Sequence, residues 1–210
     1  MLKILIADDF PIVRQGVIQA LQEEGSLEKI DEANTGHEAL EKIRANHYDV
    51  VLLDISMPGR GGIEVLKEIK ALKPNMPVLM LSMYPEDQYA IRAMKAGASG
   101  YVNKTQDLKD LVEAVRKVAS GRKYVSEELA ENLAFSINRN LDQPLHKVLS
   151  DREFEVFRKI ASGKTVSEIA DEMSLSVKTI STYRSRILEK MTIKNNAEIT
   201  RYAIQNKIVE

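Results

Sequence analysis

The chain has 210 residues, of which 44% are hydrophobic, and its 30 Lys and Arg residues nearly balance its 31 Asp and Glu residues. This length allows two modest domains, each with its own core. No apolar stretch is long enough to span a membrane, so we expect a cytoplasmic protein with no membrane partner. The absence of cysteine excludes disulfides and thiol chemistry.

Apolar strand candidates alternate with segments of helical periodicity in residues 1–120. Strands are expected at 3–7, 29–33, 50–54, 78–82 and 100–103, and helices at 12–23, 36–45, 63–72, 87–96 and 108–120. Right-handed crossovers between parallel strands give a doubly wound sheet with helices on both faces. We therefore expect an α/β domain with a five-stranded parallel sheet in residues 1–120.

The pattern changes after Gly121, and no strand pattern returns. Residues 121–147 are expected to form a connector, with an amphipathic helix at 126–139 and a polar linker at 138–144. The segments with helical periodicity beyond it are 150–162, 166–173, 177–191 and 195–205. Residues 148–210 are therefore predicted to form a small all-α domain.

The most informative stretch of the first domain is VVLLDISMPG, residues 50–59. Its apolar run is typical of a strand buried on both faces, and the run ends at Asp54 before Pro58 and Gly59 break the chain. The first predicted strand ends in Asp8 and Asp9, and in a doubly wound sheet these two strands are neighbours at the ligand-binding edge. Three carboxylates in one pocket repel one another, which predicts a hard divalent cation, most simply Mg²⁺.

Two further polar residues end or follow strands of the same predicted sheet. Ser82 is the last residue of one strand, and Lys104 follows another. A carboxylate can accept a phosphoryl group as nucleophile, an ammonium and a metal can neutralise its charge, and a hydroxyl can donate a hydrogen bond to it. Each residue alone has an ordinary explanation, such as a helix cap, a turn or a solvated lysine. Their expected convergence on one edge indicates phosphoryl chemistry at Asp54.

Residues 1–120 resemble the receiver domain of two-component signalling. The residues that carry the resemblance are an acidic pair, an acceptor carboxylate with the Met57-Pro58-Gly59 that follows it, a hydroxyl, an aromatic and a lysine: Asp8, Asp9, Asp54, Ser82, Tyr101 and Lys104. The resemblance implies a flavodoxin-like fold and transfer of a phosphoryl group from a histidine kinase to Asp54.

The same resemblance implies roles for the residues around the acceptor. Mg²⁺ would be held by two carboxylates and a backbone carbonyl, with a further carboxylate assisting through water: Asp9, Asp54, Ser56 and, through water, Asp8. Tyr101 would turn inward as Ser82 moves towards the phosphoryl group. Without the resemblance, Tyr101 would be read as an ordinary aromatic of an edge strand.

The predicted helix at 177–191 has two different faces. Its expected buried stripe is Val177, Ile180, Ile187, Leu188 and Met191, and its short polar stripe is Lys178, Ser181, Thr182 and Ser185. Residues 177–194 contain five bases and one acid. Small hydroxyls can reach base edges while Lys and Arg neutralise phosphates, so this helix suits a major groove, although a solvated basic face explains the pattern as well.

Residues 149–206 resemble the LuxR-type helix-turn-helix. The match covers LSDREFEVFRKIASG, then VSEIADEMSLSVKTISTYRSRILEKM, then NNAEI. The resemblance implies base-facing positions for Ser181, Thr182 and Ser185. It implies positions near phosphates for Lys178, Thr179, Tyr183, Arg184 and Lys190. The base-facing set lacks Arg, Lys, Asn and Gln, whose bidentate contacts define base preference, so no operator sequence follows from it.

Together the two resemblances indicate a response regulator of the NarL/FixJ class, a regulator rather than an enzyme. The expected partners are a histidine kinase, double-stranded DNA at promoter sites and, on phosphorylation, a second copy of the chain. One alternative is a phosphatase of the haloacid-dehalogenase type, which needs a second Asp two residues after the nucleophile, where this chain has Ser56. The other is a phosphorylated adaptor whose helical domain binds protein instead of DNA.

Overall fold

The computed structural model of the protein describes residues 2–23, 25, 27–84, 86–126, 129–131 and 144–209. The chain divides into two compact units, residues 1–136 and 137–210, and each is described by itself. Within the described ranges, no helix combines the length and the apolar character needed to cross a membrane. Most of the helix predicted at 126–139 and of the linker predicted at 138–144 lies outside the described residues.

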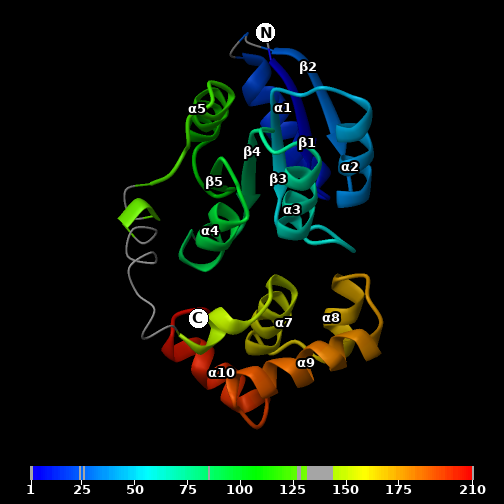
Figure 1. Cartoon of the computed structure of the whole chain (residues 1–210), viewed down its shortest axis with the longest axis vertical. Coiled ribbons are helices and arrows are strands. Elements are labelled where there is room, and N and C mark those ends of the chain that lie inside the picture. Colours follow the sequence, from blue (N-terminus) through cyan, green and yellow to red (C-terminus); the bar gives the residue numbers. More distant parts are fainter. Residues whose placement is uncertain are drawn as a thin grey trace. The chain divides into compact units, whose positions relative to one another are not determined.

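The first unit contains one sheet of five parallel strands in the order β2-β1-β3-β4-β5 (Figure 1). The strands are β1 (Leu2–Ala7), β2 (Leu27–Ala33), β3 (Val50–Asp54), β4 (Val78–Ser82) and β5 (Gly100–Asn103). The helices between and after them are α1 (Pro11–Glu23), α2 (Gly36–Ala45), α3 (Gly62–Leu72), α4 (Glu86–Lys95) and α5 (Leu108–Ala119). The predicted α/β architecture is confirmed, with element ends within two residues of those expected.

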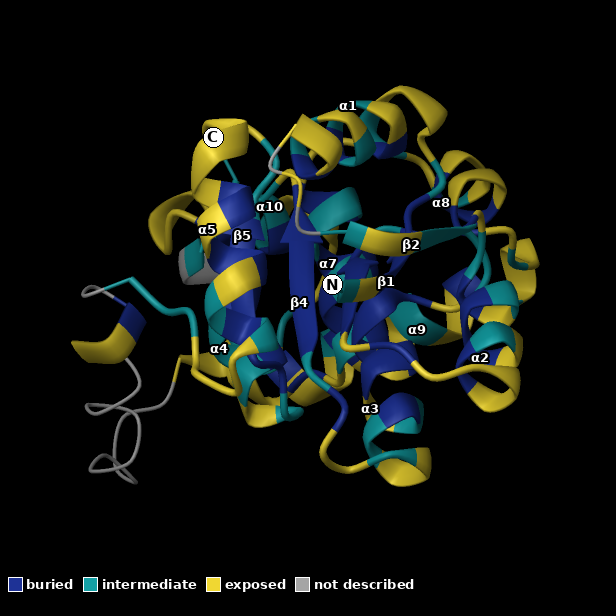
Figure 2. Cartoon of the chain, turned by 90° about the horizontal axis from the view of Figure 1, so that it is seen from above, coloured by how far each residue is buried: buried dark blue, intermediate teal, exposed yellow. Residues whose placement is uncertain are grey.

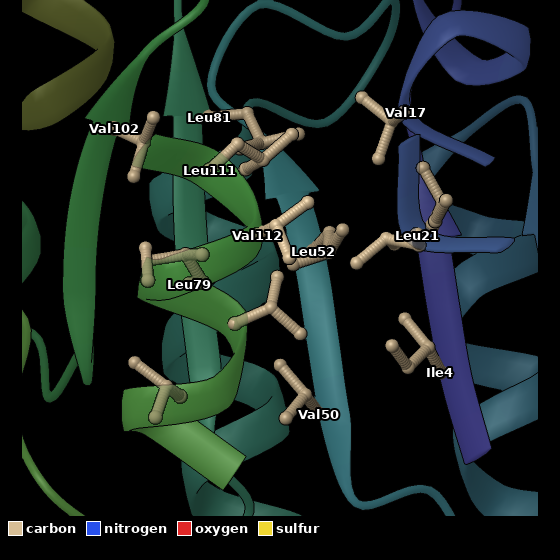
Figure 3. Close-up of a cluster of buried hydrophobic side chains, with 14 residues drawn as sticks. Ile4, Val17, Leu21, Val50, Leu52, Leu79, Leu81, Val102, Leu111 and Val112 are labelled. Carbon is tan, nitrogen blue, oxygen red and sulfur yellow. The ribbon is translucent and has the colours of Figure 1, made fainter. Parts of the chain in front are cut away.

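The core of this unit lies between the sheet and the helices that cover it. Figure 3 shows one cluster, in which Val17 and Leu21 of α1 and Leu111 of α5 pack on strand residues such as Leu52. Every residue of β3 and β4 is buried, as expected for strands covered on both faces. Figure 2 shows β4 in the dark blue of buried residues, while the outer sides of α1 and α2 are exposed.

The strand register brings the polar strand ends to one edge of the sheet. Ala7 of β1 pairs with Leu53 of β3, so Asp8 and Asp54 follow on neighbouring strands. Farther along the sheet, Ser82 pairs with Asn103, and the backbone N–H of Lys104 donates to the carbonyl of Ser82 at 2.7 Å. The apolar patterning of the strands, which fixes this register, therefore also assembles the acidic edge.

The second unit is helical. Its elements within residues 144–209 are a short 3₁₀ helix, η1 (Leu145–Val148), and four α-helices, α7 (Asp151–Ala161), α8 (Val166–Glu172), α9 (Val177–Met191) and α10 (Asn196–Gln205). The 3₁₀ helix was not predicted, because four residues give too little periodicity to detect. The four α-helices confirm the prediction, and polar side chains cap the starts of all four: Ser150, Thr165, Ser176 and Asn195.

The start of α3 lies against the backbone of Asp54. The N–H of Gly62 donates to the carbonyl of Ile55 at 2.8 Å. A Cβ atom at position 62 would lie 2.0 Å from the carbonyl oxygen of Asp54, which is a clash with backbone rather than with a mobile side chain. Only glycine therefore allows α3 to begin this close to the strand end that carries Asp54.

We expect Gly62→Ala to lower the free energy of unfolding of the first unit by about 2 kcal/mol or more, because backbone must move to admit the methyl group. Urea unfolding followed by circular dichroism measures this change. The matched control is Gly16→Ala in α1, where a Cβ would meet nothing within 4 Å. This control should stabilise by about 0.5–1 kcal/mol through its helix propensity. Equal changes in the free energy of unfolding for the two variants would contradict the close approach of Gly62 to the backbone of Asp54.

Candidate functional site

Three carboxylates lie together where β1 and β3 end. Asp8, Asp9 and Asp54 each offer an oxygen, and these oxygens lie within 4.8 Å of one another. Asp8 and Asp54 are almost completely buried, with exposed fractions of 0% and 2%. The structure therefore brings together the acidic residues that the strand ends predicted would meet.

Lys104 supplies a positive charge inside this cluster. Its Nζ lies 2.6 Å from Oδ2 of Asp8 and 3.0 Å from Oδ1 of Asp54, and its side chain is 6% exposed. The loop after β5 delivers this side chain, held by the backbone bond from Lys104 to Ser82. One ammonium shared between two buried carboxylates leaves the cluster with an excess of negative charge.

The electrostatics of Asp54 follow from this environment. Burial, which penalises the charged form, raises the pKa of Asp54 to about 6, and the charge of Asp8 adds to the effect. The Lys104 ammonium and the backbone N–H of Ser56 act in the opposite direction. Burial is also the largest cause that raises the pKa of Asp9. Asp54 is thus mainly ionised at neutral pH, although its charge is poorly solvated.

The cluster fits a hard divalent cation. Oδ1 of Asp9 and Oδ2 of Asp54 are buried and accept no hydrogen bond from the described part of the chain. Buried oxygens without a donor are costly, and carboxylate oxygens are the ligands that Mg²⁺ prefers. The carboxylate of Asp8 is occupied differently, because Oδ1 accepts from the N–H of Phe10 at 2.9 Å and Oδ2 faces Lys104. Asp9 and Asp54 are therefore the carboxylates best placed to bind the metal directly.

Ser82 and Tyr101 are linked through the loop that follows β4. Ser82 is buried, and its Oγ accepts from the N–H of Tyr84 at 3.0 Å. Tyr101 is completely buried, and its hydroxyl donates to the carbonyl of Tyr84 at 2.7 Å. Tyr101 lies on the edge strand β5, and in this structure its side chain is already buried.

Sequence reasoning missed Arg14, a buried residue beside the cluster. Its Nη1 donates to the backbone carbonyl of Asp8 at 2.6 Å, and its Nε donates to Glu32 of β2 at 2.8 Å. The guanidinium thereby fixes the backbone of the acidic pair without occupying its carboxylates. Helical spacing could have revealed it. Arg14 lies three residues before Val17 and seven before Leu21, which places it on the buried face of α1.

The second candidate surface is the polar stripe of α9. Lys178, Ser181, Thr182 and Ser185 are all exposed, as their spacing predicted. The hydroxyls of Thr182 and Ser185 donate to the carbonyls of Lys178 and Ser181, so each hydroxyl oxygen keeps acceptor capacity. Two members of the predicted buried stripe are not buried, because Leu188 is only half-buried and Val177 is exposed. Val177 is 50% exposed, because it begins the helix one turn before Ile180 enters the core.

Two basic residues of α9 already have partners within the unit. The Nε of Arg184 donates to Asn196 at the start of α10, at 2.7 Å, which orients its guanidinium. The Nζ of Lys190 donates to the buried carboxylate of Glu153 at 2.7 Å. Burial acts to raise the pKa of Glu153, but hydrogen bonds from Lys190 and Ser150 outweigh it and hold that pKa below its usual value. Lys190 therefore neutralises a buried acid, whatever it contacts outside.

We expect Asp54→Asn to stabilise the metal-free protein at pH 7.5. A folded-state pKa raised from 3.8 to about 6 means that the folded state holds a proton more tightly than the unfolded chain. The Asp54 carboxyl therefore lowers the free energy of unfolding progressively as the pH rises from 3.8 to about 6, and the whole decrease is present above pH 6. Two pKa units correspond to about 2–3 kcal/mol.

Urea unfolding with a chelator at pH 7.5 and pH 3.5 measures this difference, which should be present at pH 7.5 and almost absent at pH 3.5. Mg²⁺ should then raise the stability of the wild type more than that of Asp54→Asn, because only the wild type keeps both unpaired oxygens. A variant that is less stable than the wild type at pH 7.5 would contradict the electrostatic description.

Each of the two units matches a known protein family. Residues 4–116 match the response regulator receiver domain, and residues 147–203 match the bacterial regulatory proteins of the luxR family. These ranges contain the acidic cluster with Lys104 in the first unit and the exposed stripe of α9 in the second. The two family matches therefore coincide with the two candidate sites.

Whole-length relatives have the same organisation. The chain is 35% identical to the response regulator GacA of Pseudomonas syringae pv. syringae over 211 residues, covering 100% of the chain and 99% of GacA. It is 34% identical to the response regulator UvrY of Escherichia coli K12, covering 98% and 95%. A structure of RcsB from Salmonella enterica serovar Typhimurium, bound to promoter rprA with the phosphomimetic BeF3-, matches 96% of the chain and 97% of RcsB, with a TM-score of 0.67 and 26% identity. The chain therefore belongs to the response regulators of the NarL/FixJ class, in which a receiver domain precedes a LuxR-type helix-turn-helix domain.

Proposed function

We propose that Asp54 accepts a phosphoryl group from a histidine kinase and that this modification controls dimerisation and DNA binding by the helical unit. The observation that supports it best is the buried carboxylate of Asp54. One of its oxygens lies against Lys104, and the other receives no hydrogen bond from the residues that the structure describes. In this proposal residues 1–120 are the receiver, 121–147 the connector and 148–210 the DNA-binding domain. The kinase, the regulator and the promoter would meet in the cytoplasm.

The chemical step is a displacement at phosphorus. A carboxylate oxygen of Asp54 attacks the phosphorus of a phosphohistidine, an O–P bond forms, the P–N bond breaks and the imidazole leaves. With a pKa of about 6, Asp54 is ionised at neutral pH and can act as the nucleophile. Lys104 neutralises charge on the transferring group, and Ser82 donates a hydrogen bond to it. Mg²⁺, held by Asp9, Asp54 and the carbonyl of Ser56 and by Asp8 through water, would supply further charge neutralisation.

The modification is transmitted through Ser82. Its hydroxyl accepts the N–H of Tyr84, and the carbonyl of Tyr84 accepts the hydroxyl of Tyr101. When Ser82 turns its hydroxyl towards the phosphoryl group, the backbone of Tyr84 follows and Tyr101 must adjust. The result is a changed surface around α4 and β5, which either releases the helical unit or favours pairing of two receivers.

The output is DNA binding by α9. Its exposed stripe would face base edges through Ser181, Thr182 and Ser185. The residues proposed to lie near phosphates are Lys178, Thr179, Tyr183, Arg184 and Lys190. A surface with so few base contacts should bind weakly as a monomer, so two copies on two half-sites would supply the useful affinity. The likeness to RcsB, whose structure is bound to promoter rprA with a phosphomimetic, supports this direction of control.

We expect beryllofluoride with Mg²⁺ to convert the wild type from monomer to dimer and to raise its affinity for promoter DNA, because occupancy of the Asp54 pocket drives both changes. Analytical ultracentrifugation and fluorescence anisotropy with promoter fragments selected from genomic DNA measure the two effects. Asp54→Ala is the control and should show neither. Dimerisation and tighter binding in Asp54→Ala as well would contradict the proposal.

We expect Lys178→Ala to weaken DNA binding uniformly across sequences and to reduce the slope of log K against log salt by about 1, because one phosphate contact is lost. The structural comparison is Lys190→Ala, which removes the partner of buried Glu153 and should lower stability by about 1 kcal/mol as well. Circular dichroism checks the fold of each variant. Full DNA affinity in Lys178→Ala, with the salt slope unchanged, would favour a helical unit that binds protein instead.

A further inference from the structure

After α5, the chain runs beside the edge of the sheet that β5 forms. β5 is the last strand of the sheet, and no strand of the described residues lies beside its outer edge. Tyr124 forms a parallel bridge with Gly100, and its N–H donates to the carbonyl of Ser99 at 2.9 Å. The Nζ of Lys123 donates to the carbonyl of Ala98 at 2.6 Å. Lys123 and Tyr124 thus bind the chain to the backbone at the start of β5, and residues 122–126 are named the edge segment.

The contact between Gly100 and Tyr124 depends on the missing side chain of Gly100. A Cβ at position 100 would lie 2.7 Å from the carbonyl oxygen of Tyr124, so the close approach requires glycine. The aromatic ring of Tyr124 also lies 5.5 Å from Nζ of Lys117 in α5. Backbone, side-chain and ring contacts therefore hold the edge segment, which follows α5 (Figure 1) and lies at the start of the proposed connector.

A second contact joins the edge segment to α4. The hydroxyl of Ser126 donates to the carboxylate of Glu86, the first residue of α4. The same oxygen accepts from the N–H of Leu129 at 3.0 Å. A hydrogen bond to a carboxylate is stronger than one between neutral groups, which makes this the most specific side-chain contact of the segment.

The start of α4 is in turn tied to Ser82. Tyr84 lies two residues before Glu86, and its N–H donates to the hydroxyl oxygen of Ser82. Its ring stacks on Tyr89 in α4, with centroids 5.2 Å apart. A displacement of Ser82 is therefore passed to Tyr84 by a hydrogen bond and to α4 by both the chain and the ring contact. Glu86 lies within this short path, next to its partner Ser126.

We propose that the open edge of β5 and the start of α4 form a docking surface for the edge segment, and that phosphorylation of Asp54 loosens it. The phosphoryl group draws the hydroxyl of Ser82 towards Asp54, Tyr84 follows, and Glu86 separates from Ser126. The connector then gains freedom at its first residues. This inference rests on the proposed function of Asp54, but it concerns a surface that neither the kinase nor DNA is proposed to touch.

The test measures hydrogen exchange at the amide of Tyr124 in the full chain, by nuclear magnetic resonance, with and without beryllofluoride plus Mg²⁺. Loss of one hydrogen bond should speed exchange by roughly 2- to 10-fold. Glu86→Ala should raise the basal rate by a similar factor, and Ser126→Ala by at least as much, because it also removes the acceptor of the Leu129 N–H. The double variant should add little to Ser126→Ala, because Glu86 and Ser126 share one bond. Glu86→Gln keeps an acceptor oxygen and should remain close to the wild type.

The amide of Ser99, which donates to the carbonyl of Val78 inside the sheet at 2.7 Å, is the internal control and should stay protected throughout. Unchanged exchange at Tyr124 in wild type that still gains DNA affinity with beryllofluoride would overturn this inference and leave the proposed function intact. No gain in DNA affinity would instead count against the proposed function. Normal basal exchange in both alanine variants would overturn the role of the Ser126–Glu86 bond.

Discussion

The central physical constraint is the burial of more negative charge than the protein itself neutralises. Asp8, Asp9 and Asp54 lie within one small cluster, and Lys104 pairs directly with two of them. Burial raises the pKa of Asp54 to about 6, so the ionised carboxylate that predominates at neutral pH lowers the stability of the folded state. In the proposed function, a cation and a phosphoryl group would both bind at this uncompensated negative charge, and a change at one side chain would thereby alter the structure around it.

The rest of the first unit keeps the pocket in this unfavourable state. Strands β3 and β4 are buried along their whole length, and their register sets the strand ends side by side. Gly62 lets α3 begin against the backbone of Asp54, and Arg14 holds the carbonyl of Asp8 from the other side. The apolar core thus provides the free energy, while a few close backbone contacts provide the geometry. In the helical unit, caps and the Glu153–Lys190 pair similarly fix the ends of the helices around the exposed stripe of α9.

The architecture and the acidic cluster could be predicted from sequence because they depend on local periodicity and on strand ends. Asp54 ends a run buried on both faces, and sheet topology alone places it beside Asp8. Contacts that depend on three-dimensional detail could not be found this way. Three such contacts join residues that are far apart in sequence or separated by irregular chain. They are the hydrogen bond from Tyr101 to Tyr84, the bridge between Tyr124 and Gly100, and the pairing of Lys190 with Glu153. Val177 was wrongly predicted to be buried, because helical periodicity does not show at which residue a helix enters the core.

The most direct test of the account is to locate the phosphoryl group after the protein reacts with a small phosphoryl donor and Mg²⁺. Mass spectrometry of the intact chain and of its peptides, after reductive trapping of acyl phosphates, gives the site. The account predicts one phosphoryl group per chain, carried by Asp54, no incorporation in Asp54→Ala, and much slower incorporation when Mg²⁺ is chelated. A phosphoryl group on another residue, or incorporation that does not depend on Mg²⁺, would contradict it.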